Sequence, residues 1–265
     1  MITPILMLGA GRMGGAMVEG WRAAGVFAPT DLMIRDPSPG PSALAAEKAG
    51  AILNPPDADL ARAATVVLGV KPQIWREAAA ETAAWLGSGA VIVSIAAGVK
   101  QADIAKAFGG RPVARVMPTT AAAIGQGTAS VFADDPAALA RAHALFEPLG
   151  TVVSLTDENL MHAATAVSGS SPAYLYAFIE ALEAAGAAAG LSPKDAQRLA
   201  RSTLTGAAAL LARTGEDPAE LRRQVTSPGG TTQAALDVLL ANGALPDLMR
   251  EAVAGAVRRS KELGA

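Results

Sequence analysis

The stretch ITPILMLGAGRMG, residues 2–14, decides the fold of the first half of the chain. Ile2–Leu8 is a short apolar run typical of a strand, and the glycine motif GAGRMG follows it directly. Apolar residues then recur at helical spacing, at Met17, Val18 and Trp21. A strand, a tight glycine turn and a helix in this order are typical of a Rossmann fold, and they predict an NAD or NADP site.

Each glycine of the motif has a physical role in that site. Gly9 permits the tight turn, Gly11 lets the backbone lie against a pyrophosphate, and Gly14 lets the helix sit close to the sheet. The N-terminus of the helix favours the negative charge. The residues expected to hold the cofactor here are Gly9, Ala10, Gly11, Arg12, Met13 and Gly14.

The second predicted strand, Leu32–Arg35, ends in Asp36. An acidic residue about 20 positions after the glycine motif is placed to accept hydrogen bonds from the adenosine ribose. Arg35, or Arg12 in the turn, could instead pair with the extra phosphate of NADP. The two arginines favour NADPH, and the choice between NAD and NADP stays open.

The alternation of strands and helices continues to about residue 155. Continuous β-branched runs at 65–70 and 90–95, with further strands at 112–117, 128–133 and 151–155, predict an α/β domain with a mostly parallel sheet. Ligands of such sheets lie at the carboxyl ends of the strands. The segments expected on that edge are Val70–Gln73, Ala96–Gly98 and Met117–Thr120.

From Glu158 onward the sequence predicts helices only. We place a dinucleotide-binding Rossmann domain at 1–155 and an all-helical domain at 156–265. Two long alanine-rich segments, Pro172–Gly190 and Pro193–Thr214, have little polar cover and therefore predict a homodimer interface.

The segment VTSPGGTT, Val225–Thr232, combines a turn stripped of side chains with hydroxyls that open a helix. It is either a helix-capping turn or a pocket for a small anion.

Composition excludes several classes of function. A formal net charge of −2 without a basic run argues against nucleic acid or an anionic membrane as partner. The absence of cysteine excludes disulfides and a thiol nucleophile, and fits the cytoplasm. No metal site is expected, because the two histidines, His143 and His162, form no ligand cluster. A histidine such as His162 is more often structural than catalytic.

Six motifs, taken in order, resemble the Δ1-pyrroline-5-carboxylate reductase family over nearly the whole chain. VTSPGGTT is the most specific of them and GAGRMG the least. The sequence departs from the family at Thr119 and Ala121, where MPNTPA is usual, and at Ser171, where a glycine is usual, so substrate preference or rate could differ. The other four motifs are VKPQ (70–73), SIAAGV (94–99), RVMPTTAA (115–122) and SGSSPAY (168–174).

The resemblance implies NAD(P)H-dependent reduction of pyrroline-5-carboxylate to L-proline by a homodimer, often in a ring of dimers. It implies that the loop at Ser227–Thr232 holds the substrate carboxylate and that Thr232 contacts the ring nitrogen as the catalytic residue. The implied substrate residues are Glu158, Gln224, Ser227, Gly230, Thr231 and Thr232. The further implied cofactor residues are Gly69, Val70, Lys71, Pro72, Ile95, Ala96 and Ala97.

The chemistry fits a chain without a recognisable acid-base set. An imine that binds already protonated needs no strong protein acid, whereas a ketone reductase needs a donor to the alkoxide. Three alternatives remain open: a reductase of larger cyclic imines, a β-hydroxyacid dehydrogenase, and a nucleotide sensor without turnover. The dehydrogenase requires a catalytic lysine, and no lysine occurs between Lys106 and Lys194.

Overall fold

The computed structural model describes residues 2–263. Short strands alternate with helices up to residue 154, and only helices follow. The strands are β1 (Ile5–Leu8), β2 (Leu32–Arg35), β3 (Ile52–Leu53), β4 (Thr65–Leu68), β5 (Val91–Ser94), β6 (Val113–Met117), β7 (Gly127–Phe132) and β8 (Gly150–Ser154). The α-helices are α1 (Arg12–Ala24), α2 (Pro41–Lys48), α3 (Trp75–Thr82), α4 (Gln101–Ala107), α5 (Pro136–Phe146), α6 (Leu160–Ala164), α7 (Ser171–Ala188), α8 (Pro193–Thr214), α9 (Pro218–Gln224), α10 (Thr231–Leu239) and α11 (Ala244–Leu263).

The strands form one sheet in the order β3-β2-β1-β4-β5-β6-β7-β8. All neighbouring pairs are parallel except β6 and β7, which run antiparallel. The predicted mostly parallel Rossmann sheet is therefore confirmed.

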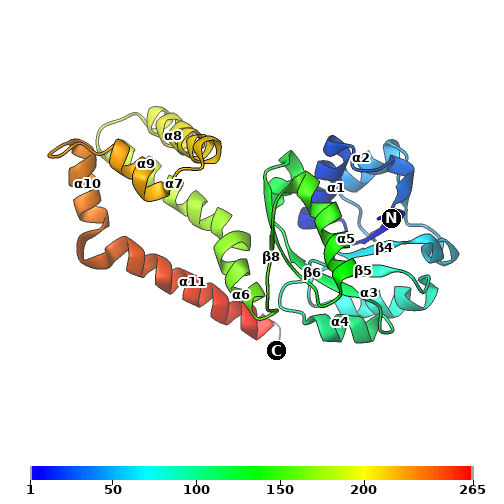
Figure 1. The fold of residues 1–265 in the computed structure, drawn as a ribbon. Helices are drawn as coiled ribbons and strands as arrows, with labels where there is room; N and C mark the ends of the chain where they lie inside the picture. The colour runs from blue at the N-terminus through cyan, green and yellow to red at the C-terminus, as the bar shows by residue number, and fades with distance from the viewer. Residues whose placement is uncertain (1, 264–265) are drawn as a thin grey trace. The chain divides into compact units, whose positions relative to one another are not determined.

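The sheet is buried on both faces by helices (Figure 1). Ile5 and Met7 of β1 point to the face covered by α1, α2 and α5, whereas Leu6 and Leu8 point to the face covered by α3 and α4. Successive side chains of a strand alternate between faces, so a strand covered on both sides must be apolar throughout. The continuous apolar runs of the sequence have this physical origin.

By its contacts, the chain divides into two compact units. One contains residues 2–169 together with 255–263, and the other contains residues 170–254. The boundary predicted after residue 155 differs from this division, because α6 and the last turns of α11 are grouped with the sheet.

The helical unit has almost no core of its own within one protomer. In residues 170–254 only Ile179, Ala196 and Ala200 are buried hydrophobic residues. Large apolar side chains are instead exposed along α7, α10 and α11, such as Tyr176, Val238 and Leu248. Apolar surface of this extent marks a protein-protein interface.

Candidate active site

The predicted cofactor residues gather at one edge of the sheet. Leu8, at the end of β1, pairs in register with Arg35 of β2 and with Leu68 of β4. Leu68 in turn pairs with Ser94, the last residue of β5. The four loops that follow these strands therefore leave the sheet side by side. In an open parallel sheet, ligands bind at this edge.

The glycine turn has the space and shape that a dinucleotide requires. Gly9 has a φ of +85°, and a Cβ on Gly14 would lie 2.4 Å from the carbonyl oxygen of Gly9. A Cβ on Gly11 would meet no atom of the chain within 4 Å. The turn is thus closed toward the protein and open on its outer side, where a pyrophosphate would lie against the N-terminus of α1. These residues fit NAD(P).

Asp36 braces this turn from the next strand. Its Oδ2 accepts from the amide of Ala10 at 2.7 Å, and its Oδ1 accepts from the amide of Ser38 at 2.8 Å. The residue is only 8% exposed. Asn54 fixes the backbone of Asp36, accepting from its amide at 2.9 Å and donating to its carbonyl at 3.0 Å. The carboxylate therefore positions the glycine turn in addition to the role predicted for it at the ribose.

The two arginines considered for the phosphate of NADP differ in their surroundings. Arg35 donates to the carbonyl of Pro55 at 3.2 Å and pairs with the carboxylate of Asp57. Arg12 lines a cavity of about 480 Å³ together with Gly11 and Ser38. Arg35 in turn lines a neighbouring cavity of about 420 Å³. Arg12 therefore lies beside the glycine turn, whereas Arg35 lies beside the end of β2 and is already paired.

The other predicted cofactor segments are short rim loops. Gly69 follows β4, and its amide donates to the carbonyl of Leu8 at 2.8 Å. Val70 lines a second cavity, of about 420 Å³, next to Pro37 and Asn54. Ile95 donates to the carbonyl of Leu68 at 3.1 Å. The segments Gly69, Val70, Lys71, Pro72 and Ile95, Ala96, Ala97 thus share the edge predicted for them.

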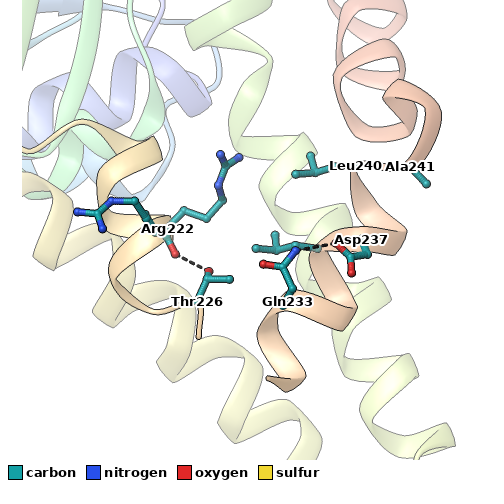
Figure 2. A pocket seen from close by; sticks show the side chains of 8 residues that line it. Arg222, Thr226, Gln233, Asp237, Leu240 and Ala241 are labelled. Carbon is teal, nitrogen blue, oxygen red and sulfur yellow. Dashed lines mark hydrogen bonds between the residues drawn. The ribbon is translucent and has the colours of Figure 1, made fainter. Parts of the chain in front are cut away.

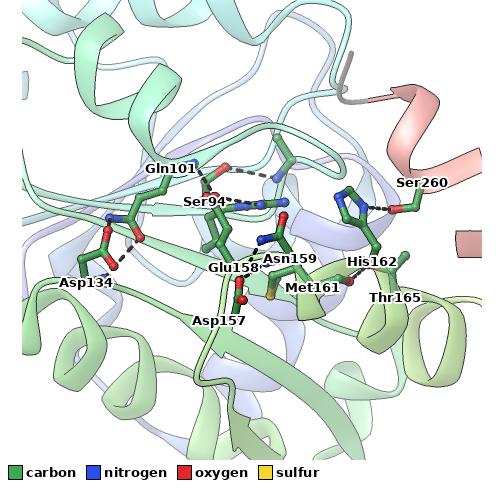
Figure 3. A network of polar contacts seen from close by, with 12 residues as sticks. Ser94, Gln101, Asp134, Asp157, Glu158, Asn159, Met161, His162, Thr165 and Ser260 are labelled. Atoms are coloured by element: carbon green, nitrogen blue, oxygen red, sulfur yellow. Dashed lines mark hydrogen bonds and ion pairs between the residues drawn. The ribbon is translucent and has the colours of Figure 1, made fainter. Parts of the chain in front are cut away.

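An ion pair joins Arg115, which is buried on β6, to the partly exposed Glu158 between β8 and α6. Figure 3 shows Glu158 beside Gln101. Arg115 of β6 is 4% exposed, and its guanidinium donates to Oε1 of Glu158 at 2.8 Å. The same oxygen accepts from the amide of Gln101, the first residue of α4, at 2.6 Å. One carboxylate predicted to bind substrate is therefore already bound to the protein at one of its oxygens.

His162 of α6 faces Ser260 of α11 (Figure 3). Its Nδ1 lies 2.9 Å from the hydroxyl of Ser260, a buried residue of α11. Partial burial, followed by the positive charges of Arg115, Lys261 and Lys100, lowers the pKa of His162, and Glu158 opposes this shift. The geometry gives His162 a structural role, as a tie between α6 and α11.

The VTSPGGTT segment joins α9 to α10 within the helical unit. Gly229 has a φ of +72°, and the amide of Gly230 donates to the carbonyl of Ser227 at 3.0 Å. Helix α10 starts at Thr231, and its N-cap, Gly230, provides no side-chain cap. The first N–H groups of α10 therefore stay available, as an anion site requires.

A cavity of about 420 Å³ lies between α9 and α10 (Figure 2). Thr226 donates to the carbonyl of Arg222, and Gln233 donates to Asp237 at 2.6 Å.

Gln224, predicted to bind substrate, donates to Glu216 at 2.7 Å and to Glu220 at 3.3 Å. Its amide nitrogen is thus directed to two carboxylates of its own unit.

Sequence reasoning missed the partners that hold the predicted residues in place. Arg115 was visible as an arginine within an apolar strand, which implies a buried counter-charge. Thr119, one of the departures from the family, is buried, and its hydroxyl accepts from the amide of Thr128 at 3.0 Å. Thr119 therefore fixes the start of β7.

Residues 2–263 contain no group of three or more His, Cys, Asp or Glu side chains suited to a metal ion. Within the same residues, every helix is too short or too polar to cross a membrane.

Two family models match the chain. Residues 158–263 match the family described as pyrroline-5-carboxylate reductase dimerisation. Residues 4–98 match the family described as NADP oxidoreductase coenzyme F420-dependent. The helical half thus matches a dimerisation domain, in agreement with its exposed apolar surface.

Solved structures share the fold over the whole chain. A pyrroline-5-carboxylate reductase from Coxiella burnetii has a TM-score of 0.90 and 31% identity, and the match covers 100% of both chains. The Plasmodium falciparum pyrroline carboxylate reductase with NADP bound has a TM-score of 0.85 and 25% identity, covering 99% of this chain and 98% of the other.

Curated relatives match over the same length. The pyrroline-5-carboxylate reductase of Pseudomonas aeruginosa is 40% identical over 271 residues, covering 99% of this chain and 98% of the relative. The Synechocystis sp. enzyme of the same name is 38% identical, covering 97% of each chain. With this identity over nearly its full length, the chain belongs to the pyrroline-5-carboxylate reductase family.

Proposed function

We propose that the protein reduces 1-pyrroline-5-carboxylate to L-proline with NAD(P)H, as the last step of proline synthesis. The observation that carries the proposal is the match to reductases of this name over 99% of the chain. The dinucleotide edge of the sheet and the anion-accepting start of α10 give this chain the two kinds of group that the reaction requires.

The cofactor, when bound, supplies a hydride to the carbon of the C=N bond. Because the cofactor supplies the difficult chemistry, the chain itself mainly binds, orients and stabilises the reactants. Because the imine enters protonated, the ring nitrogen already carries the charge that the hydride neutralises, and no strong protein acid is needed.

The substrate carboxylate is proposed to bind at the start of α10. The hydroxyls of Ser227 and Thr231 and the N–H groups after Gly230 suit a carboxylate, and the helix N-terminus adds a favourable potential. The hydroxyl of Thr232, one residue further along, hydrogen-bonds the ring nitrogen and so orients the C=N bond.

Thr232→Ala tests this assignment. We expect kcat/KM for pyrroline-5-carboxylate to fall by about 10- to 100-fold, as for loss of a hydrogen bond to a charged group. Thr232→Ser, which keeps the hydroxyl, should retain most of the activity. An unchanged rate in Thr232→Ala would remove the role given to Thr232.

Steady-state assays with NADH and NADPH test the reaction and the cofactor preference together. Arg12 lines the cavity beside the glycine turn, and this supports a preference for NADPH. Assays with a six-membered cyclic imine acid and with 3-hydroxy acids serve as the substrate controls. Turnover of either control in place of pyrroline-5-carboxylate would contradict the proposal.

The proposal extends to the setting of the enzyme. Homodimers form through the helical domain, associate into a ring of dimers, and work in the cytoplasm without a nucleic-acid partner. The near-neutral net charge of −2 supports the last point. Light scattering after size-exclusion chromatography measures the assembly, and a mass of one dimer at all concentrations would exclude the ring.

A further inference from the structure

We infer that Glu77 of α3 determines which base the chain accepts in its dinucleotide. The carboxylate of Glu77 accepts a hydrogen bond from the exocyclic amine of adenine, and it disfavours a base that has a carbonyl group at the same position. The inference rests on the proposed function, because it takes the glycine turn as the binding site of NAD(P)H. It adds to that site a residue that recognises the base.

Two cavities adjoin the loop after β2, and their linings suit different parts of a dinucleotide. Ser38 lines the cavity of about 480 Å³ that also contains Arg12, at the N-terminus of α1. This lining favours phosphate groups. Pro37 lines the other cavity, of about 420 Å³, a volume within the range of small-molecule sites. The charged groups of this second cavity are two carboxylates and an arginine that is already paired, so it suits the uncharged base better than a phosphate.

The second cavity has an apolar lining on which a planar base can lie. Leu8, Val70 and Ala78 line it, and Ile74, directly before α3, is 46% exposed there. A ring that covers Ile74 removes apolar surface from water, which stabilises the complex. Such contacts do not distinguish adenine from hypoxanthine, because the two bases share one ring system. The choice between them therefore depends on a polar group.

Glu77 has an unused acceptor beside this lining. Within residues 2–263, its carboxylate forms no hydrogen bond or ion pair, although Arg35 lines the same cavity. Arg35 is instead paired with Asp57 and donates to the carbonyl of Pro55. An ionised carboxylate can only accept hydrogen bonds, so the ligand group that suits Glu77 is an N–H donor.

The direction of α3 favours Glu77 over Glu81, which lines the same cavity. Helix α3 begins at Trp75, after the loop that leaves the carboxyl end of β4, so Glu77 lies in its first turn. Because β5 runs parallel to β4, α3 leads away from the carboxyl edge of the sheet. Glu81 lies four residues further, about 6 Å along the helix axis. A base attached to a ribose at Asp36 therefore reaches Glu77 first.

Adenine and hypoxanthine differ at the position that Glu77 recognises. Adenine has an amine there, which donates, whereas hypoxanthine has a carbonyl oxygen, which accepts. The carboxylate of Glu77 therefore favours adenine and repels hypoxanthine. The side-chain amide of a glutamine both accepts and donates, so Glu77→Gln is expected to bind either base.

The measurement is the Kd for NADPH and for reduced nicotinamide hypoxanthine dinucleotide phosphate, each by fluorescence titration without any imine present. We expect the unsubstituted chain to bind the hypoxanthine dinucleotide about tenfold more weakly, the low end for a hydrogen bond to a charged group, because Glu77 is exposed to water. In Glu77→Gln the two Kd values should agree within about threefold, mainly through tighter binding of the hypoxanthine dinucleotide. Glu81→Gln is the matched control, because it removes the same charge from the same helix and should keep the tenfold ratio.

Three outcomes would overturn the inference: equal Kd values in the unsubstituted chain, an unchanged ratio in Glu77→Gln, or a ratio lost only in Glu81→Gln. Melting temperatures of the two variants without ligand establish that they fold. A chain that distinguishes the two dinucleotides as expected but reduces no imine would refute the proposed function and leave the inference standing. A chain that binds neither dinucleotide would refute both.

Discussion

Substitution of Gly11 by alanine tests the cofactor site with little disturbance of the fold. The new Cβ meets no atom of the chain within 4 Å, and the φ of −64° at Gly11 suits alanine. Gly11 is the N-cap of α1, a position that glycine prefers over alanine, so the cost to the free energy of unfolding is at most about 1 kcal/mol. The methyl group instead occupies the space where the pyrophosphate is expected.

The magnitude for binding follows from what that methyl displaces. A hydrogen bond to a charged group contributes about 1.5–3 kcal/mol, so pushing a phosphate away from one backbone N–H raises the Kd for NADPH by about 10- to 100-fold. Gly14→Ala provides the contrast. Its Cβ would lie 2.4 Å from the carbonyl oxygen of Gly9, and an ordinary contact needs at least 3.4 Å, so the helix must shift by about 1 Å.

Such overpacking costs about 1–3 kcal/mol, which for a chain of this size corresponds to a drop in Tm of at least about 2–4 °C. The assay pairs differential scanning fluorimetry of the free protein with NADPH titration by fluorescence. We expect Gly11→Ala to lose binding with a drop in Tm of no more than about 2–4 °C, and Gly14→Ala to lower the Tm by at least that much. If Gly11→Ala binds NADPH within twofold of wild type, the turn does not hold the pyrophosphate.

Two further predictions concern stability and assembly. Because the pKa of His162 in the folded protein lies below its unfolded value of 6.5, the unfolded state binds more protons, and stability falls as the pH drops through about 6.5. His162→Gln should therefore show a shallower loss of stability between about pH 7 and 5.5 in urea unfolding, and equal slopes would contradict this. Val238, 74% exposed on α10, should lie in the dimer interface, so Val238→Glu is expected to raise the dimer Kd more than about tenfold. Analytical ultracentrifugation measures it, with Gln126→Glu on the sheet unit as control; a dimer as tight as wild type would exclude Val238 from the interface.

The sequence predicted the sheet well because its signals are local. The buried strands are continuous apolar runs, and the helices α5, α8 and α9 begin at prolines preceded by capping Asp135, Ser192 and Asp217. The glycine motif was equally informative, since its constraints lie within one turn of chain. The short β3 and helix α2 were not predicted, because two strand residues and an eight-residue helix leave little periodicity to detect.

The part that the sequence could not predict depends on contacts between distant segments. Glu158 and Arg115 are 43 positions apart, and Asp36 reaches back to Ala10 across 26. Neither pairing has a local sequence signal, so the sequence analysis assigned both carboxylates to ligands. In the structure, both carboxylates form hydrogen bonds to groups of the protein itself. The reach of α11 back to α6 is the same kind of long-range contact, joining His162 and Ser260 across 98 positions.

That return of the chain has a consequence for synthesis. Residues 255–263 belong to the unit built by residues 2–169, so this first unit lacks a piece until residues 255–263 have left the ribosome. The sheet can begin to fold during translation, whereas the docking site for α11 beside His162 stays uncovered until residues 255–263 have emerged. A nascent chain arrested before residue 255 should therefore expose this patch, and residues 255–263, although remote from the glycine turn in sequence, complete the nucleotide-binding unit.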